Sequence, residues 1–115
     1  MTVLANRTRF FKQIETQWEL VADGVQRQIM GFDDRIMMVN VKFAKGAIGP
    51  LHSHHHTQVT HIAAGVFEVT IEEETRILKK GDSFYIPSNS IHGVVCLEEG
   101  ILIDVFSPMR EDFIK

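Results

Sequence analysis

The chain is a succession of short apolar or alternating runs separated by turn-forming residues, and this rhythm restricts its fold more than any other feature. Glycine, proline, aspartate and asparagine punctuate the chain between runs that are rich in β-branched and bulky side chains. The runs fall at residues 25–30, 35–44, 58–64, 66–72, 75–78, 83–86, 93–97 and 101–106. Many short strands spaced by turns predict an all-β protein, either an antiparallel sandwich or a barrel.

Two pairs of neighbouring runs predict local strand pairs. Glu72, Glu73 and Glu74 lie where the runs at 66–72 and 75–78 meet, and we interpret them as the solvated turn of a hairpin. The runs at 93–97 and 101–106 form a last pair around Glu98-Glu99-Gly100. Ahead of the strands we expect an N-terminal arm over residues 1–17, with a short helix or an extended segment at 9–17. Residues 18–115 then form one barrel domain.

Length, charge and cysteine content exclude several classes of function. A length of 115 residues is enough for one domain. The net charge is −3 and there is no long basic stretch, so nucleic acid is not an expected partner. No segment approaches the roughly 20 apolar residues of a membrane span, so we expect no membrane association. The single cysteine, Cys96, cannot form an internal disulfide, which fits a reducing cytoplasm.

Two histidine-bearing motifs have the spacing of a single metal pocket. They read Gly46-x5-His52-x-His54-x3-Gln58-x6-Gly65 and Gly81-x5-Pro87-x-Asn89-x2-His92. Residues two apart on a strand point to the same side, so His52, His54 and Gln58 can face one interior. His92 would arrive there from a distant strand. Three imidazoles and an amide oxygen converging on one point make a site for one divalent transition metal, and nickel, zinc, manganese and iron all accept these ligands.

The other histidines leave one alternative open. A lone histidine is usually a hydrogen-bonded core or loop residue, but three histidines at two motif positions favour a metal site. His56 shares the parity of the motif histidines, so it competes with Gln58 as the fourth ligand, and the motif spacing favours Gln58. His55 and His61 have the opposite parity and are expected outside the pocket.

The two motifs resemble the paired signatures of the cupin superfamily. Members of that superfamily fold into a double-stranded β-helix, or jelly-roll barrel, so the resemblance implies this fold here. It covers about residues 46 to 96, with both spacings intact. Gln58 stands where cupins usually have glutamate, and Cys96 stands where the second motif often has asparagine. The glutamine would leave the metal more cationic and therefore a stronger Lewis acid. Because many reactions use this barrel, the superfamily alone does not identify the chemistry.

Further segments extend the resemblance over about residues 17 to 114. They are Arg27-Gln28, Met37-Met38-Val39, Gly46-Ala47-Ile48-Gly49, His52-Ser53-His54, Ser83-Phe84-Tyr85-Ile86-Pro87 and Ile103-Asp104-Val105-Phe106-Ser107-Pro108-Met109-Arg110-Glu111-Asp112-Phe113. Together they resemble the KdgF family of pectin-degradation cupins. This resemblance implies an enzyme that opens and ketonises 4,5-unsaturated uronates, the monosaccharides released by pectate and alginate lyases. It implies metal ligands at His52, His54, Gln58 and His92, and site residues at Asp104, Phe106 and Arg110. That family uses glutamine at the ligand position, which agrees with Gln58.

Asp104 lies inside an apolar run, Ile101-Leu102-Ile103-Asp104-Val105-Phe106, and a carboxylate buried there needs a partner. It either orients a ligand histidine by accepting a hydrogen bond or acts as a general acid and base, and the resemblance favours acid-base catalysis. Phe106 has the same parity and is a pocket wall or a core residue. Arg110 is either a surface arginine or a bidentate clamp on a substrate carboxylate.

We therefore predict metal-dependent ring opening and ketonisation of a 4,5-unsaturated uronate, with Asp104 and Arg110 as catalytic residues and Phe106 and Arg110 in contact with the substrate. The alternatives are a small metal-dependent dioxygenase and a sugar-binding module without turnover. We also expect a homodimer. A barrel of this size has exposed sheet edges, and the arm from Phe10-Phe11 to Trp18 carries apolar residues without an obvious local partner.

Overall fold

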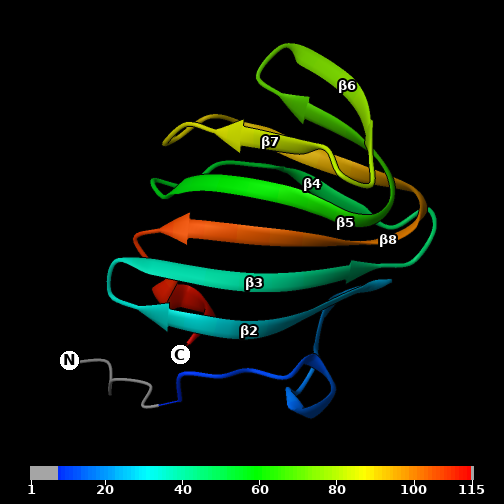
Figure 1. The fold of residues 1–115 in the computed structure, drawn as a ribbon. Helices are drawn as coiled ribbons and strands as arrows, with labels where there is room; N and C mark the ends of the chain where they lie inside the picture. The colour runs from blue at the N-terminus through cyan, green and yellow to red at the C-terminus, as the bar shows by residue number, and fades with distance from the viewer. Residues whose placement is uncertain (1–7, 115) are drawn as a thin grey trace.

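The structure, a computed structural model, describes residues 8–114 and is an all-β barrel of antiparallel strands, as predicted (Figure 1). Within the described residues, eight strands form one sheet in the order β1-β2-β3-β8-β5-β6, while β4 pairs with β8 and β7 pairs with β5. The strands are β1 (Glu19–Ala22), β2 (Val25–Asp33), β3 (Ile36–Phe43), β4 (Ile48–His52), β5 (Thr57–Ile71), β6 (Glu74–Lys79), β7 (Ser83–Ile86) and β8 (His92–Ser107). There are also two 3-10 turns, η1 (Gln13–Glu15) and η2 (Glu111–Phe113). Among the described residues, no helix has the length and apolar character needed to cross a membrane.

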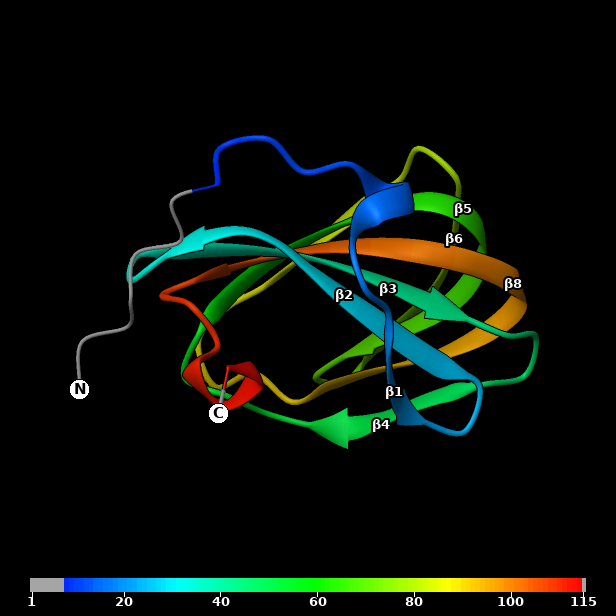
Figure 2. The same cartoon turned by 90° about the horizontal axis from the view of Figure 1, so that it is seen from below.

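Two long strands, β5 and β8, form the frame of the barrel. They pair with each other along their length, from Thr57↔Ser107 to Ile71↔His92. The first part of β8 also pairs with β4 and its last part with β3. In the same way, β5 pairs with β7 near its start and with β6 near its end. Each long strand therefore belongs to two parts of the sheet, which curls around an interior (Figure 2).

Both long strands bend without ending, so two of the predicted strand breaks are wrong. The predicted runs that merge into single strands are 58–64 with 66–72, and 93–97 with 101–106. The register between β5 and β8 shifts around Gly65. Gly65 has a φ of 87°, and a Cβ on this residue would lie 2.5 Å from the carbonyl oxygen of Glu99. Glycine here permits a close crossing of two continuous strands.

The acidic hairpin is confirmed, whereas the strand β4 was not predicted. β5 and β6 join through a turn at Glu72 and Glu73, and Glu72 adopts a φ of 54°. β4 lies between the predicted runs 35–44 and 58–64 and contains Gly49 and Pro50, residue types that usually separate strands. It pairs with β8 at an edge of the sheet, and Pro50 lies at an irregularity in that pairing, where a missing N–H is tolerated.

Two clusters of buried side chains fill the barrel. The larger one contains Val25, Phe43, Ile62, Phe67, Val69, Cys96 and Leu102. Phe43 and Phe67 meet edge to face, with ring centroids 5.3 Å apart. The smaller one contains Met37, Val39, Phe106 and Met109. Phe43 and Phe106 line the same pocket, so this pocket lies between the two clusters.

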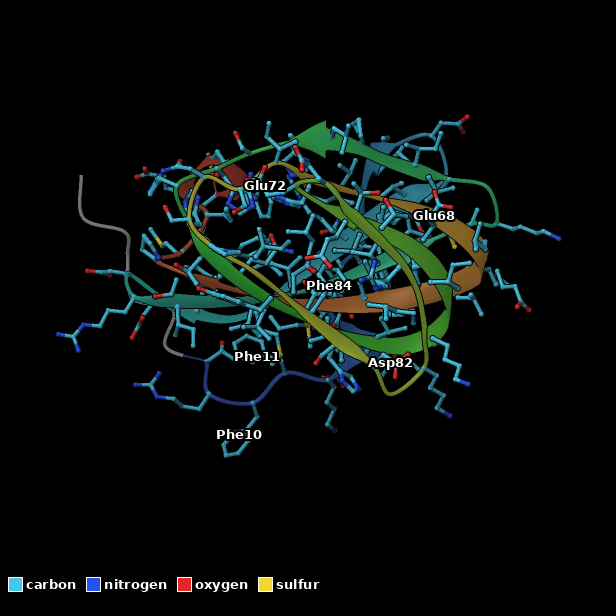
Figure 3. The ribbon with its side chains drawn as sticks, turned by 90° about the horizontal axis from the view of Figure 1, so that it is seen from above. Phe10, Phe11, Glu68, Glu72, Asp82 and Phe84 are labelled. Carbon is cyan, nitrogen blue, oxygen red and sulfur yellow. The ribbon has the colours of Figure 1, made fainter. Side chains whose placement is uncertain are left out.

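A buried glutamine holds the N-terminal arm against the barrel. Gln28 of β2 is 1% exposed, and its Nε2 donates to two carbonyl oxygens in and just after η1, at 3.2 and 3.0 Å. Phe11 lies over Gly31, where a Cβ would be 3.4 Å from the ring. Phe10 points away from the barrel and is 90% exposed (Figure 3). The arm is thus an extended segment with one short 3-10 turn, and its residues 1–7 lie outside the described residues.

Candidate metal centre

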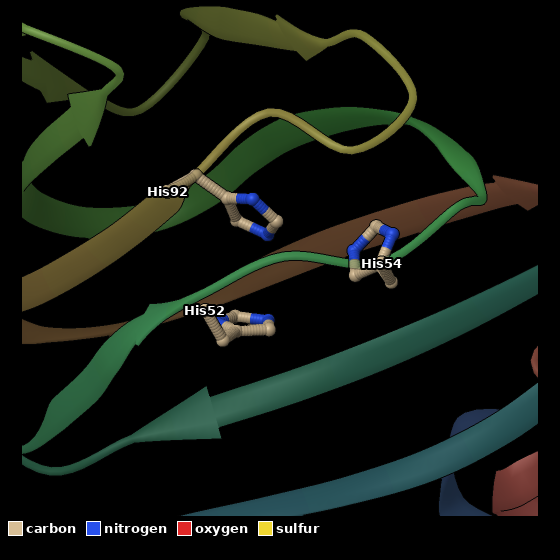
Figure 4. Close-up of side chains that lie close together, drawn as sticks. All are labelled: His52, His54 and His92. Atoms are coloured by element: carbon tan, nitrogen blue, oxygen red, sulfur yellow. The ribbon is translucent and has the colours of Figure 1, made fainter.

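Three of the four predicted ligands are histidines whose rings meet; His92 is buried, His54 is half-buried and His52 is exposed. His52 is the last residue of β4 and His92 the first residue of β8, and they stand opposite each other in the β4–β8 pair. His54 comes from the loop that leads into β5. Each of the three offers a ring nitrogen within 4.8 Å of the other two (Figure 4). The end of β4, the loop that follows it and the start of β8 therefore present one converging set of imidazoles.

A backbone carbonyl fixes each of these three rings. Every Nδ1 lies 2.8 to 3.0 Å from a carbonyl oxygen two residues away, belonging to Pro50, His56 or Ser90. A carbonyl oxygen only accepts, so each Nδ1 carries the ring proton and donates it. The other nitrogen, Nε2, then presents a lone pair, which is the form in which histidine binds a metal.

Gln58, the fourth predicted ligand, lies beside His54. Its Oε1 is 3.0 Å from His54 Nε2. Both atoms are acceptors when the His54 proton is on Nδ1, and burial lowers the pKa of His54, which disfavours a second ring proton. A cation bound by both atoms removes this conflict. The 3.0 Å distance between the two atoms would let them hold one ion together.

His92 gives a second indication of a metal. The residue is buried, and within the described part of the chain its Nε2 has no hydrogen-bond partner. Burial lowers the pKa of His92 to about 4, so the ring is neutral near pH 7. A buried polar nitrogen without a partner requires an explanation, and a bound ion supplies one. The residues therefore fit a divalent transition metal, which accepts neutral imidazole nitrogen together with amide oxygen.

The remaining histidines of this region do not belong to the converging set, although the ring centroids of His56 and His54 are 5.3 Å apart. His56 is buried, and its ring stacks beside that of His55 with 3.9 Å between centroids. Among residues 8–114, the converging histidine group does not include it. The parity that made His56 a competitor of Gln58 does not apply, because residues 53–56 form a loop and side chains alternate only along a strand. His55 and His61 are exposed.

The cluster opens into a pocket of about 270 Å³. Apolar side chains form much of its wall, including Val41, Phe43, Phe84 and Leu102. The polar side chains that line it are those of Arg27, His52, Gln58, His92, Asp104 and Arg110. Phe106 lines it as well, so the three residues predicted beside the metal share one cavity with three of the four candidate ligands. An apolar pocket with a few converging polar groups is typical of a small-molecule site.

Asp104 stands opposite Thr60 in the β5–β8 pair. Thr60 Oγ1 donates to Asp104 Oδ1 at 2.6 Å, and Gln58 Nε2 donates to the same oxygen at 3.3 Å. Asp104 thus contacts the glutamine of the candidate ligand set. Burial raises the pKa of Asp104 to about 6, although Thr60, Arg110 and Gln58 act in the opposite direction. A carboxyl group that titrates close to neutral pH can both take up and release a proton.

Arg110 lines the pocket and is not a surface arginine, because only 13% of its side chain is exposed. Its Nε and Nη2 donate to the two carboxylate oxygens of Asp112 at 3.1 and 2.9 Å. The guanidinium carbon lies 4.2 Å from the ring centroid of Phe113 and 5.1 Å from that of Phe106. Two of the five N–H groups are used in this way, so others remain for an anion in the pocket.

Three residues near the pocket were not predicted as functional. Arg27 of β2 lines the cavity, pairs with Glu19 at 2.7 Å and lies 3.8 Å from the ring centroid of Phe113. Thr60 is fully buried beside Asp104 and shares the strand parity of Gln58, which could have identified it. Arg27 and Phe113 lie in segments that carry the family resemblance. Two guanidinium groups in one pocket favour an anionic ligand.

Comparisons with known proteins agree with this architecture. The family model described as a cupin domain matches residues 39–106, which contain both histidine motifs. The chain is 55% identical over 108 residues to the pectin degradation protein KdgF of Dickeya dadantii (strain 3937), covering 92% of this chain and 98% of that protein.

Two solved structures are similar over nearly their whole length. The crystal structure of an RmlC-like cupin from Shewanella frigidimarina NCIMB 400 has 41% sequence identity and a TM-score of 0.92, with coverage of 96% of this chain and 99% of that one. The structure of KdgF from Halomonas sp. has 42% identity and a TM-score of 0.89, with coverage of 92% and 98%. The fold, the motifs and these likenesses agree, and the chain belongs to the cupin family and, within it, to the group of proteins that includes KdgF.

Proposed function

We propose that the protein opens and ketonises 4,5-unsaturated uronates in a metal-dependent isomerisation. The observation that carries the proposal is that two histidines of the cluster, His52 and His92, line the same pocket of about 270 Å³ as an ionisable carboxyl group and a guanidinium. A cavity of this size suits a single sugar ring. The relative from Dickeya dadantii is named a pectin degradation protein, and unsaturated uronates are the monosaccharides that pectate lyases release.

In this proposal, His52, His54, Gln58 and His92 hold one divalent transition metal, such as nickel, zinc, manganese or iron. Backbone carbonyls already direct the three Nε2 lone pairs. When bound, the metal supplies Lewis acidity to a substrate oxygen that gains negative charge. Gln58 contributes a neutral amide where glutamate would contribute a carboxylate, so more of the positive charge remains for an anionic substrate.

Asp104 is assigned the proton transfer. The ionised carboxylate accepts the proton of the anomeric hydroxyl, the bond between C1 and the ring oxygen breaks, and an aldehyde forms at C1. The electron pair of that bond stays on the oxygen attached to C5 and gives an enolate. Asp104 then returns the proton to C4, and the C5 oxygen becomes a ketone. One proton leaves the anomeric oxygen and one arrives at C4, so the reaction needs no redox partner.

Arg110 is assigned the role of binding the carboxylate of the substrate. The N–H groups that Asp112 does not occupy can form charge-assisted hydrogen bonds with this anion. Phe106 is assigned the role of forming the adjacent wall of the sugar site. It is buried, and its ring lies edge-on to that of His54 with centroids 5.7 Å apart. An apolar wall here limits the access of water to the reacting carboxyl group.

Lyase-generated unsaturated monouronates provide the test. Their double bond is conjugated with the carboxylate and absorbs ultraviolet light, and ketonisation removes this conjugation. Absorbance should therefore decay much faster with the metal-loaded protein than in buffer. Decay at the buffer rate would contradict the proposed function. Oxygen consumption by the iron-loaded protein would indicate a dioxygenase, and sugar binding without turnover would indicate a binding module.

We further propose that the protein is a homodimer that uses the outer face of its sheet. Met38, Val105, Val59 and Tyr85 stand in register across β3, β8, β5 and β7, and Met38, Val59 and Tyr85 are exposed. Val105 in this row is half-buried, and an apolar row with most of its side chains exposed is typical of a protein interface. The N-terminal arm borders the row, because Phe11 and Met38 line one shallow groove. Light scattering at micromolar protein tests this, and a monomer mass would contradict it.

A further inference from the structure

Thr60 lies between the candidate metal ligand Gln58 and the candidate proton carrier Asp104. Its exposed fraction is 0%, and it shares one face of β5 with Gln58, two residues earlier. Gln58 Nε2 donates to its hydroxyl at 2.9 Å, and the hydroxyl donates to Asp104 Oδ1 at 2.6 Å. A buried hydroxyl with two short hydrogen bonds forms a defined connection between the two halves of the site.

The chemistry of the three groups allows one direction of hydrogen bonding. The amide nitrogen of Gln58 only donates, and an ionised carboxylate only accepts. Thr60 therefore accepts from Gln58 and gives its single hydroxyl proton to Asp104. Gln58 Nε2 has a second, longer contact with Asp104 at 3.3 Å. With the nitrogen held on this side, Gln58 Oε1 faces His54, 3.0 Å from its Nε2.

A half-turn of the Gln58 amide would disrupt these contacts. Oε1 would then face Asp104 as a second acceptor, and the amide nitrogen, which has no lone pair to offer a metal, would face the histidines. Thr60 could follow only by turning its proton toward Gln58. That rotation would remove the 2.6 Å hydrogen bond to Asp104, and losing the partner of a partly buried carboxylate is destabilising.

We propose that Thr60 is a positioning residue that holds the Gln58 amide with its oxygen toward the histidine cluster. The proposal rests on the metal centre of the proposed function, but not on the substrate or the reaction. It also gives a physical reason for glutamine at position 58. A glutamate would place a second carboxylate oxygen about where Gln58 Nε2 now lies, 3.3 Å from Asp104, where the two like charges would repel.

The variants Thr60→Val and Thr60→Ser separate the effect of the hydroxyl group from the effect of the side-chain shape. Valine keeps the β-branched shape and removes both hydrogen bonds, whereas serine keeps the hydroxyl. Metal-free protein is titrated with cobalt(II), and binding is followed by the visible spectrum of the bound ion. We expect Thr60→Val to bind cobalt about 10–100-fold more weakly, the usual effect of removing a group that orients a ligand. Thr60→Ser should bind like wild type.

Thr70→Val is the matched control. Thr70 lies on the same strand, and its hydroxyl pairs with that of Thr75 at 3.0 Å, outside the residues that line the main pocket. This variant makes the same chemical change on β5 and should leave cobalt affinity unchanged. If Thr60→Val does not fold, Thr60→Ala is measured in the same way.

The side-chain amide protons of Gln58 give a readout that needs no metal. Their nuclear magnetic resonance signals are assigned by their loss in Gln58→Glu. They should exchange slowly with water in wild type and in Thr60→Ser, and quickly in Thr60→Val. Wild-type cobalt affinity and slow exchange in Thr60→Val would overturn the proposal. If wild type itself bound no cobalt, the metal centre of the proposed function would fail, and the amide exchange would decide the role of Thr60 by itself.

Discussion

The substitution Asp104→Asn separates proton transfer from metal binding. Asparagine keeps the shape of the side chain, and its Oδ1 can still accept the hydrogen bond that Thr60 donates at 2.6 Å. It cannot take up a proton from a sugar hydroxyl. Metal content should therefore stay near wild type, while turnover should fall about 10²–10⁴-fold, the contribution of a positioned acid-base group. This loss corresponds to about 3–5 kcal/mol of transition-state stabilisation.

The pH dependence of activity should change in the same variant. Burial raises the pKa of Asp104 from 3.8 to about 6. Because a base must be ionised to accept a proton, wild-type kcat/KM should fall as the pH drops below that pKa and level off above it. A cation held by Gln58 favours the ionised form, so the acidic limb should lie at or below about pH 6. Asp104→Asn should lack this limb.

The same substitution should stabilise the metal-free protein near neutral pH. The folded pKa of Asp104 lies above its unfolded value, so wild type loses stability as the pH rises from 3.8 to about 6. For a fully buried group, this shift in pKa would lower the free energy of unfolding by about 3 kcal/mol. The loss is smaller here because Asp104 is partly exposed to the pocket. Urea unfolding should show Asp104→Asn as the more stable protein at about pH 7.5, with the difference shrinking toward about pH 4.

Activity per bound metal decides whether Asp104 carries the proton. Activity is measured by the decay of uronate absorbance, and the metal content of the same sample is measured by elemental analysis. Asp82→Asn is the control, since Asp82 lies in the turn between β6 and β7, where it accepts a hydrogen bond from the Lys79 backbone at 2.9 Å. It should behave like wild type. Near-normal activity per metal in Asp104→Asn would refute its assignment as the proton carrier. Metal loss in parallel with activity would instead indicate that Asp104 supports the ligand set.

Three other perturbations have defined outcomes. His52→Ala/His92→Ala should lose the metal and the thermal stabilisation that the metal provides, and equal metal in elemental analysis of both proteins would exclude the site. Arg110→Ala should raise KM more than it lowers kcat in steady-state kinetics, because the carboxylate contact exists in ground and transition states alike, and an unchanged KM would remove Arg110 from substrate binding. Burial lowers the pKa of His92 to about 4, below its ordinary 6.5, so the metal-free protein should lose up to about 3 kcal/mol of His92-dependent stability as the pH falls through that range. Urea unfolding of wild type and His92→Gln measures this, and parallel pH dependences would contradict it.

The fold class and the converging histidines of the candidate centre were predictable from the sequence alone. Turn residues between short apolar runs restrict the chain to antiparallel strands, and the hairpin at Glu72 follows from that local pattern. The spacing of His52, His54 and His92 predicted imidazoles in one place, and the structure brings their ring nitrogens within 4.8 Å of one another. These features depend on residue type and on local backbone geometry, which a sequence states directly.

Only the tertiary structure decided which residues from distant segments are in contact. Gly65 is a strand end by local pattern, but it is a bend because β8 crosses it. Thr60 and Asp104 are 44 residues apart, and their hydrogen bond exists because the β5–β8 register places them opposite each other. Arg110 is mostly shielded from solvent because η2 brings Asp112 and Phe113 against it. Each outcome depends on contacts between distant segments, and those contacts follow from the closure of the whole barrel, which no local pattern encodes.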